Sequence, residues 1–255
     1  MSFGMCIVIP CYRHAGPLLA MLPRIAAFGY PVIVVDDGNP ETEAEKLRSG
    51  IAALGGCCEE PQNASFSVSL ARLAQNSGKG AAFIKGLLLA QSLGFSHVMQ
   101  IDADGQLDIE AIPVFAKLSR NNENKIILGV PEYENPDRVR VLVRYATHFW
   151  VAVELGMWKI VDSMCGMRVY PAERAVSLVK KRKIGSRMDF DTEILVRMYW
   201  SGVDFIEQKV RVRYIKGNVS NFAPFMDNLR ISLMHTKLCA EKTLHYFAVR
   251  RRQYL

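Results

Sequence analysis

The sequence lacks the cysteine spacings that mark zinc sites and disulfide frameworks. Its six cysteines stand at positions 6, 11, 57, 58, 165 and 239, and no two of them form a C-x-x-C pair. Isolated cysteines of this kind are typical of reduced thiols in a cytoplasmic protein. We therefore expect neither a structural zinc ion nor a disulfide-stapled fold.

The sequence also lacks a long uncharged apolar run. Its most apolar later window, Val141–Ile160, contains the ionisable side chains Arg144, His148 and Glu154, which are costly inside a bilayer. The start, MSFGMCIVIPCYR, carries no charged leader, and its apolar run ends at Pro10, so it predicts a first strand and not a secretion signal. We expect a cytoplasmic protein that neither spans a membrane nor is secreted.

Two nucleotide-binding fingerprints are missing as well. The turn after the first apolar run reads PCYRHAG and has no G-x-G-x-x-G pattern, and the segment SGKG at 77–80 does not complete a G-x-x-x-x-G-K-[ST] loop. The dinucleotide-binding and P-loop classes both lose support from these absences. The basic run KKRK at 180–183 has no interleaved aromatic residue, so it predicts a solvated loop and gives no support for a nucleic-acid partner.

What is present is a chain long enough for a substantial core. It has 255 residues, half of them hydrophobic, and no linker, repeat or low-complexity tract divides it. One domain is therefore expected. The net charge of +7 favours anionic partners such as nucleotide phosphates or an anionic lipid surface.

Strand and helix patterns alternate along the first half. Apolar, β-branched runs predict strands at 5–10, 32–35, 65–70, 97–101 and 125–130, and helical patterns are found at 15–28, 40–54, 81–93 and 112–118. This alternation predicts βαβ units and an α/β fold with a mostly parallel central sheet flanked by helices. Asn39 is expected to cap the second helix, with Pro40 at its first position.

The second half predicts fewer elements. We expect a helix at Val139–Trp158, a strand pair within Val203–Ile215 and a long helix at Asp227–Val249.

Polar side chains follow several of the predicted strands. Tyr12, Asp36-Asp37 and Asp102–Asp104 all stand at strand ends. Ligands of open α/β sheets bind beyond the carboxyl ends of the strands, so these residues should converge on one cleft. Two carboxylates in a D-x-D arrangement, loosened by Gly105, suit a hard divalent cation such as Mg²⁺ or Mn²⁺. Ordinary turn chemistry is the alternative explanation.

Six blocks taken in order resemble glycosyltransferase family 2. They read CIVIPCYRHAGPL, VIVVDDGNP, NSGKGAAFIKG, MQIDADGQLD, DSMCGMRVYP and MDFDTEILVRMYWSG, and span roughly residues 5–215. The resemblance implies a single GT-A-type nucleotide-sugar-binding domain, a nucleoside-diphosphate-sugar donor and inversion at the anomeric carbon. We expect residues 1–225 to form this catalytic domain. Residues 226–255 would form a C-terminal basic amphipathic helix, packed on the domain or lying at the membrane surface.

The resemblance also implies the donor side of the site. Its donor-binding residues would be Pro10, Tyr12, Asp36, Asp37, Lys79, Gly80, Asp102 and Asp104, and its metal ligands would be Asp102, Asp104 and Gln106. A solvated lysine at a helix start is the alternative for Lys79. The family's usual Tyr-Asn-Glu is replaced here by Tyr12-Arg13-His14. Base recognition by that glutamate therefore does not carry over, and the nucleotide stays open.

The acceptor side rests on the later blocks. Asp191 resembles the base that deprotonates an acceptor hydroxyl, although a carboxylate in the first turn of a helix also serves as a cap. A base is unnecessary for a phosphate acceptor, and the run Asp102–Gln106 resembles that of polyprenyl-phosphate sugar synthases, so hydroxyl and phosphate acceptors both remain open. The other acceptor-side residues are expected to be Arg140, Arg144, Gly166 and Arg168.

Together these features predict a metal-dependent inverting glycosyltransferase that acts on a lipid-type acceptor in cell-envelope glycan or glycolipid synthesis. The alternatives are a polyprenyl-phosphate sugar synthase and a nucleotide-sugar binding module without catalysis. Peripheral association with an anionic membrane is expected through the C-terminal helix. Its apolar residues are Leu229, Leu233, Leu244 and Phe247, and its cations are Lys237, Lys242 and Arg250–Arg252.

Overall fold

The computed structural model describes residues 3–133, 138–157, 161–213, 221 and 223–253, with side chains outside the description at 138–146 and 245–253. Its strands are β1 Met5–Cys11, β2 Val32–Asp36, β3 Val68–Arg72, β4 His97–Gln100, β5 Ile126–Tyr133, β6 Arg168–Pro171 and β7 Phe205–Val212. Its α-helices are α1 Ala15–Ala27, α2 Glu41–Ala53, α3 Lys79–Ser92, α4 Ile112–Asn121, α5 Arg138–Leu155, α6 Ala172–Lys181, α7 Phe190–Trp200 and α8 Pro224–Gln253.

The strands form one sheet in the order β3-β2-β1-β4-β6-β5-β7. The β1–β2, β2–β3, β1–β4 and β5–β7 pairs are parallel, whereas β6 pairs antiparallel with both β4 and β5. The expected mostly parallel α/β sheet is thus confirmed. The reversed strand β6 has a direct consequence for the site, because it begins at the edge where β4 ends, with Arg168 opposite Gln100.

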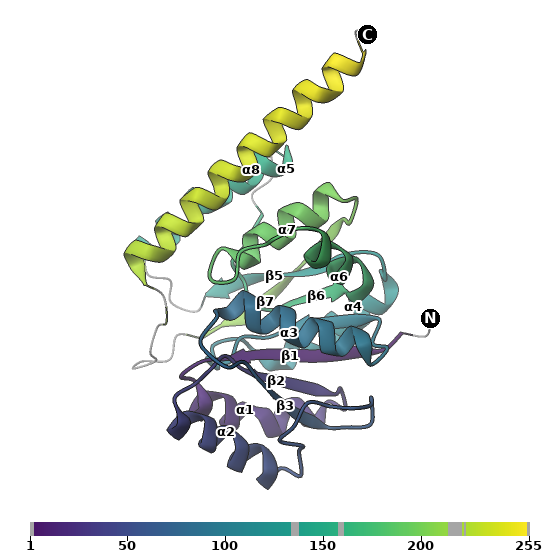
Figure 1. Cartoon of the computed structure of the whole chain (residues 1–255), viewed down its shortest axis with the longest axis vertical. Helices are drawn as coiled ribbons and strands as arrows, with labels where there is room; N and C mark the ends of the chain where they lie inside the picture. The colour runs from purple at the N-terminus through teal and green to yellow at the C-terminus, as the bar shows by residue number, and fades with distance from the viewer. Residues whose placement is uncertain (1–2, 134–137, 158–160, 214–220, 222, 254–255) are drawn as a thin grey trace.

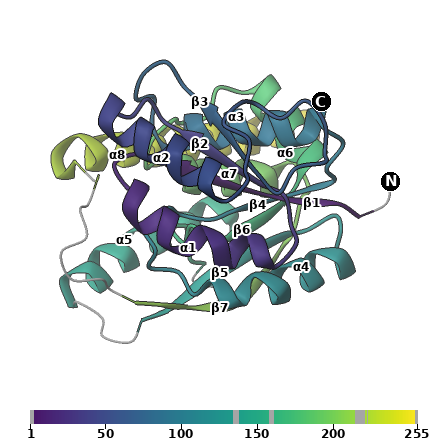
Figure 2. The same cartoon turned by 90° about the horizontal axis from the view of Figure 1, so that it is seen from below.

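Helices cover both faces of the sheet (Figures 1 and 2). Ile7 and Ile9 of β1 pack with α1, α2 and α4, while Val8 between them packs with α3, α6 and α7 on the other face. All residues of β1 and β2 are buried. A central strand covered on both sides needs a continuous apolar run, and this is why the run at residues 5–9 is not interrupted by polar residues.

Most predicted elements are present with ends shifted by a few residues, and two expectations are wrong. The described part of Val203–Ile215, residues 203–213, contains one strand and no strand pair: this strand is β7, which pairs along its whole length with β5. Asn39 does not cap α2: its side-chain amide donates to Asp36 Oδ1 and to the Cys11 carbonyl, and the helix starts at Glu41. The chain also contains β6 and α6, which the sequence did not predict.

The C-terminal helix is anchored to the domain through residues in its middle, 234–241. Met234 and Leu238 are buried, and Glu241 accepts two hydrogen bonds from the Arg197 guanidinium of α7, at 2.8 and 3.0 Å. His235 Nδ1 lies 2.7 Å from Glu154 Oε1 of α5, so α5 and α8 are joined side by side. No helix in the described residues is both long enough and apolar enough to cross a bilayer.

Candidate active site

Segments from distant parts of the sequence meet at the carboxyl edge of the sheet. The parallel strands β1, β2 and β4 deliver Tyr12, Asp36-Asp37 and Asp102 to this edge, as the sequence predicted. The reversed strand β6 starts there, so the segment at 162–168 leads into the same edge. Asp191 joins them from the first turn of α7.

Lys79, the first residue of α3, lies at the centre of this group. Its ammonium Nζ is 2.7 Å from Asp102 Oδ1 and 2.7 Å from Asp191 Oδ2, and its side chain is 17% exposed. Burial alone would lower the pKa of Lys79, but the two carboxylates outweigh it and raise that pKa above its usual value. A lysine held between two carboxylates does not fit the description of a solvated helix-start residue.

Asp191 is held by several donors besides Lys79. Gln100 Nε2 donates to Asp191 Oδ1 at 2.8 Å, and the Arg168 guanidinium donates to the Asp191 carbonyl. Burial would raise the pKa of Asp191, but the nearby cations Lys79 and Arg168 lower it below the usual value of a carboxyl. The carboxylate therefore serves to bind Lys79 and Gln100, and it does not cap its own helix.

Arg168 lies in a different place from the one expected of an acceptor-side residue. It is fully buried, and its guanidinium donates to the Cys165 and Ser163 carbonyls as well as to Asp191. A side chain enclosed by these partners cannot reach an acceptor directly. Its position indicates a role in fixing Asp191. The neighbouring Cys165 is no nucleophile, because burial raises the pKa of its thiol to about 12.

Gly166 is held directly against Asp102. A Cβ added at Gly166 would lie 1.9 Å from Asp102 Oδ2, closer than any real contact. Its φ lies outside the left-handed region in which glycine is favoured, so this close approach is what requires a glycine there. The same Cβ would lie 2.3 Å from Asp102 Oδ1, so the whole carboxylate lies against the Gly166 backbone, and its Oδ1 also contacts Lys79.

The D-x-D-x-Q segment offers oxygen ligands within one turn. Asp102, Asp104 and Gln106 are each partly exposed, and Asp104 Oδ1 accepts the Gln106 backbone N–H at 3.0 Å. Burial, with repulsion from Asp104 and Asp191, raises the pKa of Asp102, while Lys79 opposes the rise. In the described part of the chain, His, Cys, Asp and Glu side chains do not gather in threes around a metal-sized position. A donor set of two carboxylates and one amide fits Mg²⁺ or Mn²⁺, which take few protein ligands and complete their coordination with water and substrate phosphates.

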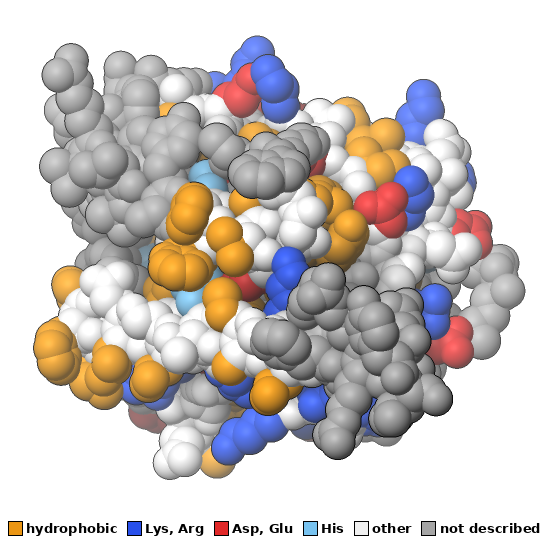
Figure 3. Space-filling view, turned by 90° about the horizontal axis from the view of Figure 1, so that it is seen from above, with side chains coloured by type: hydrophobic (Ala, Val, Ile, Leu, Met, Phe, Trp, Pro, Cys, Tyr) orange, Lys and Arg blue, Asp and Glu red, His pale blue; other side chains and the backbone are white. Residues whose placement is uncertain are grey.

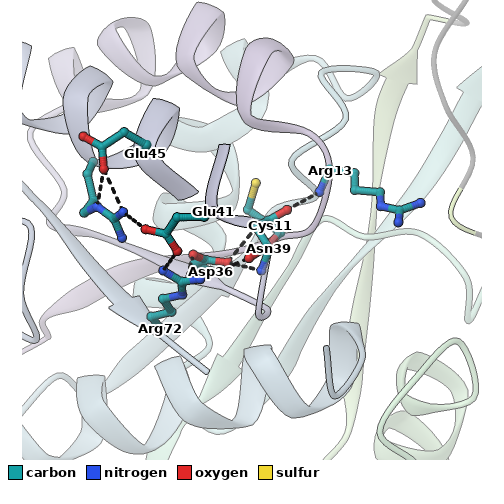
Figure 4. A network of polar contacts seen from close by, with 8 residues as sticks. Cys11, Arg13, Asp36, Asn39, Glu41, Glu45 and Arg72 are labelled. Atoms are coloured by element: carbon teal, nitrogen blue, oxygen red, sulfur yellow. Dashed lines mark hydrogen bonds and ion pairs between the residues drawn. The ribbon is translucent and has the colours of Figure 1, made fainter. Parts of the chain in front are cut away.

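The two aspartates that end β2 are engaged in turns. Asp36 is fully buried, with Oδ1 accepting from the backbone and side chain of Asn39 and Oδ2 3.3 Å from Arg72 Nε (Figure 4). Asp37 accepts the backbone N–H groups of Ser77 and Gly78. It therefore fixes the turn that leads into α3 and to Lys79.

The turn after β1 carries the departure from the family pattern. Arg13 has a positive φ of 56°, its backbone N–H donates to Asn39 Oδ1, and its guanidinium lies 5.1 Å from the centre of the Tyr12 ring. His14 Nδ1 is 2.9 Å from the Tyr12 carbonyl. Pro10 is buried within β1, so of the base-side residues only Tyr12 is partly exposed.

Gly80 has no place at the centre of this edge. Gly80 packs under α7, since a Cβ there would lie 2.5 Å from Phe190 Cβ. The side chains of Arg140 and Arg144 on α5 lie outside the described residues.

Sequence reasoning missed Gln100 and Arg187. Gln100 is a fully buried polar residue that follows the apolar residues Val98 and Met99 at the end of β4, and that interruption was the available signal. Arg187 donates to Asn76 Oδ1 at 3.0 Å and so ties the loop before α7 to the turn before α3. No local sequence pattern predicts this contact, because its partners are 111 residues apart.

Comparison with known proteins identifies a family that this chain matches and proteins that are similar to it. The model of the family described as glycosyl transferase family 2 matches residues 6–170. The dolichyl-phosphate beta-glucosyltransferase of Dictyostelium discoideum is 24% identical over 247 residues, covering 89% of this chain and 71% of its own. The undecaprenyl-phosphate mannosyltransferase of Micrococcus luteus is 25% identical over 226 residues, covering 83% of this chain and 87% of its own.

A solved structure shares the fold. Glucosyl-3-phosphoglycerate synthase from Mycobacterium tuberculosis, in complex with Mn²⁺, UDP-glucose and phosphoglyceric acid, has a TM-score of 0.62 at 14% identity, covering 94% of this chain and 80% of its own.

Proposed function

This chain belongs to glycosyltransferase family 2. From that membership we propose that it transfers a sugar from a nucleoside-diphosphate sugar to a polyprenyl-type lipid phosphate. The transfer would require a divalent cation and would invert the configuration at the anomeric carbon. The two relatives compared above are named for transfer to dolichyl phosphate and undecaprenyl phosphate. Such a product would serve cell-envelope glycan or glycolipid synthesis.

The environment of Asp191 is the observation that carries this choice of acceptor. A hydroxyl acceptor needs a general base whose pKa lies near the working pH. Asp191 has a lowered pKa and is already engaged by Lys79 and Gln100, which makes it a weak base. A phosphate arrives already ionised and needs no base. The positive Lys79 beside Asp191 suits such an anion.

The other side chains then take complementary roles. Asp102, Asp104 and Gln106 would hold the divalent cation, which when bound would neutralise the departing nucleoside diphosphate. Tyr12 would contact the base or ribose. Asp36, Asp37 and Gly80 would act indirectly by shaping the turns around the donor, because their contacts are with the protein itself.

Sugar transfer to matched acceptors tests this proposal. We expect transfer from UDP- or GDP-sugars, in the presence of Mn²⁺ or Mg²⁺, to a short-chain polyprenyl phosphate and none to the corresponding alcohol. Asp104→Asn should abolish turnover while the protein stays folded. Asp191→Asn should reduce it by less than the ~10²–10⁴-fold that loss of a general base produces. Transfer to the alcohol alone would exclude the phosphate acceptor and restore Asp191 as the base.

We further propose that the protein meets its acceptor at the cytoplasmic surface of an anionic membrane. Ten large hydrophobic side chains are exposed in the described residues, and eight of them lie on α5 or α8, namely Phe149, Trp150, Val153, Phe225, Met226, Leu229, Leu233 and Leu244. Figure 3 looks onto this side of the molecule and shows hydrophobic side chains gathered there, with Lys and Arg side chains around them. Clustering of this extent supports an interaction surface.

The C-terminal helix supplies part of this surface and not all of it. Leu229, Leu233 and Leu244 are exposed as the membrane proposal requires, whereas Leu238 is buried against the domain. The side chains of Phe247 and Arg250–Arg252 lie outside the described residues. We therefore propose that residues 226–255 act together with α5 of the catalytic domain, residues 1–225.

Vesicle co-sedimentation tests the membrane proposal. The protein should pellet with anionic phosphatidylglycerol vesicles at low salt and remain in solution with neutral phosphatidylcholine vesicles, because each Lys or Arg near an anionic surface contributes about 1 kcal/mol. Removal of residues 250–255 should reduce the pelleted fraction, and so should Leu233→Ser. Val114→Ser, at another exposed position on α4, is the control that should change nothing. Equal recovery of all variants in the supernatant would contradict the proposal.

A further inference from the structure

One ammonium group links the two halves of the site. Lys79 Nζ contacts Asp102, which follows β4 on the donor side, and Asp191, which starts α7 on the acceptor side, with both distances at 2.7 Å. Resting on the proposed function, we propose that Lys79 and the divalent cation compete for Asp102. Donor loading would then shift the Lys79 ammonium toward the acceptor phosphate.

The competition follows from how Asp102 is enclosed. Its carboxylate lies against the Gly166 backbone, where there is no room even for a Cβ, and its Oδ1 is buried and lies against Lys79. A divalent cation that binds Asp102 would therefore bind at Oδ2, on the carboxylate whose other oxygen Lys79 already holds. Two positive groups on one carboxylate repel each other strongly in a partly buried site.

Asp191 keeps the displaced ammonium in the site. Its carboxylate is fixed by Gln100 Nε2 at 2.8 Å, and its carbonyl is fixed by Arg168, and both of these side chains are fully buried. Lys79 can therefore lose Asp102 and remain bound to Asp191. A lysine ammonium has three donors, so the release from Asp102 frees one more of them for a phosphate oxygen of the acceptor and removes a competing negative partner.

This arrangement predicts an order of binding. The acceptor phosphate should bind more tightly after the donor and cation than before them, because Lys79 is then released from Asp102. The same linkage requires that the acceptor strengthens cation binding by an equal factor.

Cation binding to the EDTA-treated protein tests the proposal without any turnover. Mn²⁺ affinity is measured by electron paramagnetic resonance in the absence of sugar donor. We expect Lys79→Met to raise Mn²⁺ affinity about tenfold or more, since it removes a competing charge, and to lower the affinity for a short-chain polyprenyl phosphate. A merely structural role for Lys79 would instead lower both affinities.

Two more variants provide a test that does not depend on whether Lys79→Met folds correctly. Asp191→Asn should lower Mn²⁺ affinity, because Lys79 then has only Asp102 as a charged partner and holds it more firmly. Lys85→Met is the matched control, since Lys85 lies on the same helix and pairs with Glu60 on the surface at 2.7 Å. It should leave Mn²⁺ affinity unchanged.

The outcomes separate this inference from the proposed function. Unchanged or lower Mn²⁺ affinity in Lys79→Met, or higher affinity in Asp191→Asn, would overturn the competition even in an active enzyme. Opposite shifts in the two variants, together with no transfer to polyprenyl phosphate, would support the competition and reject the proposed acceptor.

Discussion

Replacing Gly166 with alanine tests whether the segment before β6 positions Asp102. The added Cβ would lie 1.9 Å from Asp102 Oδ2 and 2.1 Å from its Cγ. Carbon atoms and their non-bonded neighbours approach no closer than about 3.5 Å without repulsion. Asp102 must therefore move by more than about 1 Å, which is enough to break its 2.7 Å contact with Lys79.

Two magnitudes follow from this displacement. Forcing an extra carbon into a packed position costs typically about 1–3 kcal/mol of the free energy of unfolding. A misplacement of about 1 Å at a reacting centre can cost about 10²-fold in rate. We expect Gly166→Ala to show both effects and to weaken Mn²⁺ binding as well.

The assay compares this variant with Gly16→Ala. Gly16 lies in α1, and an added Cβ would meet no atom within 4 Å beyond its chain neighbours, so alanine there should leave Mn²⁺ affinity and turnover unchanged. Urea unfolding, Mn²⁺ affinity and turnover are measured for both variants. If Gly166→Ala kept wild-type Mn²⁺ affinity and turnover, the claim that Gly166 positions Asp102 would be wrong.

Three further changes have defined outcomes. Gln100→Met removes the amide that holds Asp191, and should lower turnover about tenfold or more with little change in donor KM, measured by steady-state kinetics. Burial lowers the pKa of His97 below its value in the unfolded chain, so the free energy of unfolding should fall as the pH drops below about 6.5. In urea titrations, His97→Gln should make the free energy of unfolding depend less on pH in this range. Hydrogen bonds from Arg197 lower the pKa of Glu241, so ionised Glu241 stabilises the fold above about pH 4.3 and this stabilisation is lost in acid. Glu241→Gln should therefore lower Tm at neutral pH.

Local sequence patterns predicted the elements whose residues serve only packing. The β-branched run at 32–35 and the apolar runs at 5–9 and 126–128 are buried in the centre of the sheet, and a strand covered on both faces has few other sequence solutions. The D-x-D segment was also visible, because its oxygen ligands are neighbours in the chain. The carboxyl-edge rule then placed it on the same edge of the sheet as the end of β2 without further information.

The remaining features depend on contacts between distant residues. Lys79 and Asp191 are 112 residues apart, and Gln100 and Asp191 are 91 apart. No periodicity reports such a pairing. β6 was not predicted because it has only four residues and starts with a buried arginine. An arginine considered on its own predicts a surface position. Asn39 was misassigned as a helix cap because its side-chain amide donates to Asp36 and to the Cys11 carbonyl instead. Only the folded sheet brings Cys11 close to Asn39.

The reversal of β6 explains why donor and acceptor sides are linked at all. In a wholly parallel sheet, a connecting segment would reach the carboxyl edge only as the end of a strand. Here the antiparallel strand starts at that edge, so the segment ending at Arg168 crosses it first and places Gly166 against Asp102. The same strand then aims Arg168 at Asp191. Both aspartates that hold Lys79 are thus positioned by residues two positions apart, Gly166 at the Asp102 carboxylate and Arg168 at the Asp191 carbonyl. A displacement of this short segment should therefore disturb cation binding and acceptor binding together.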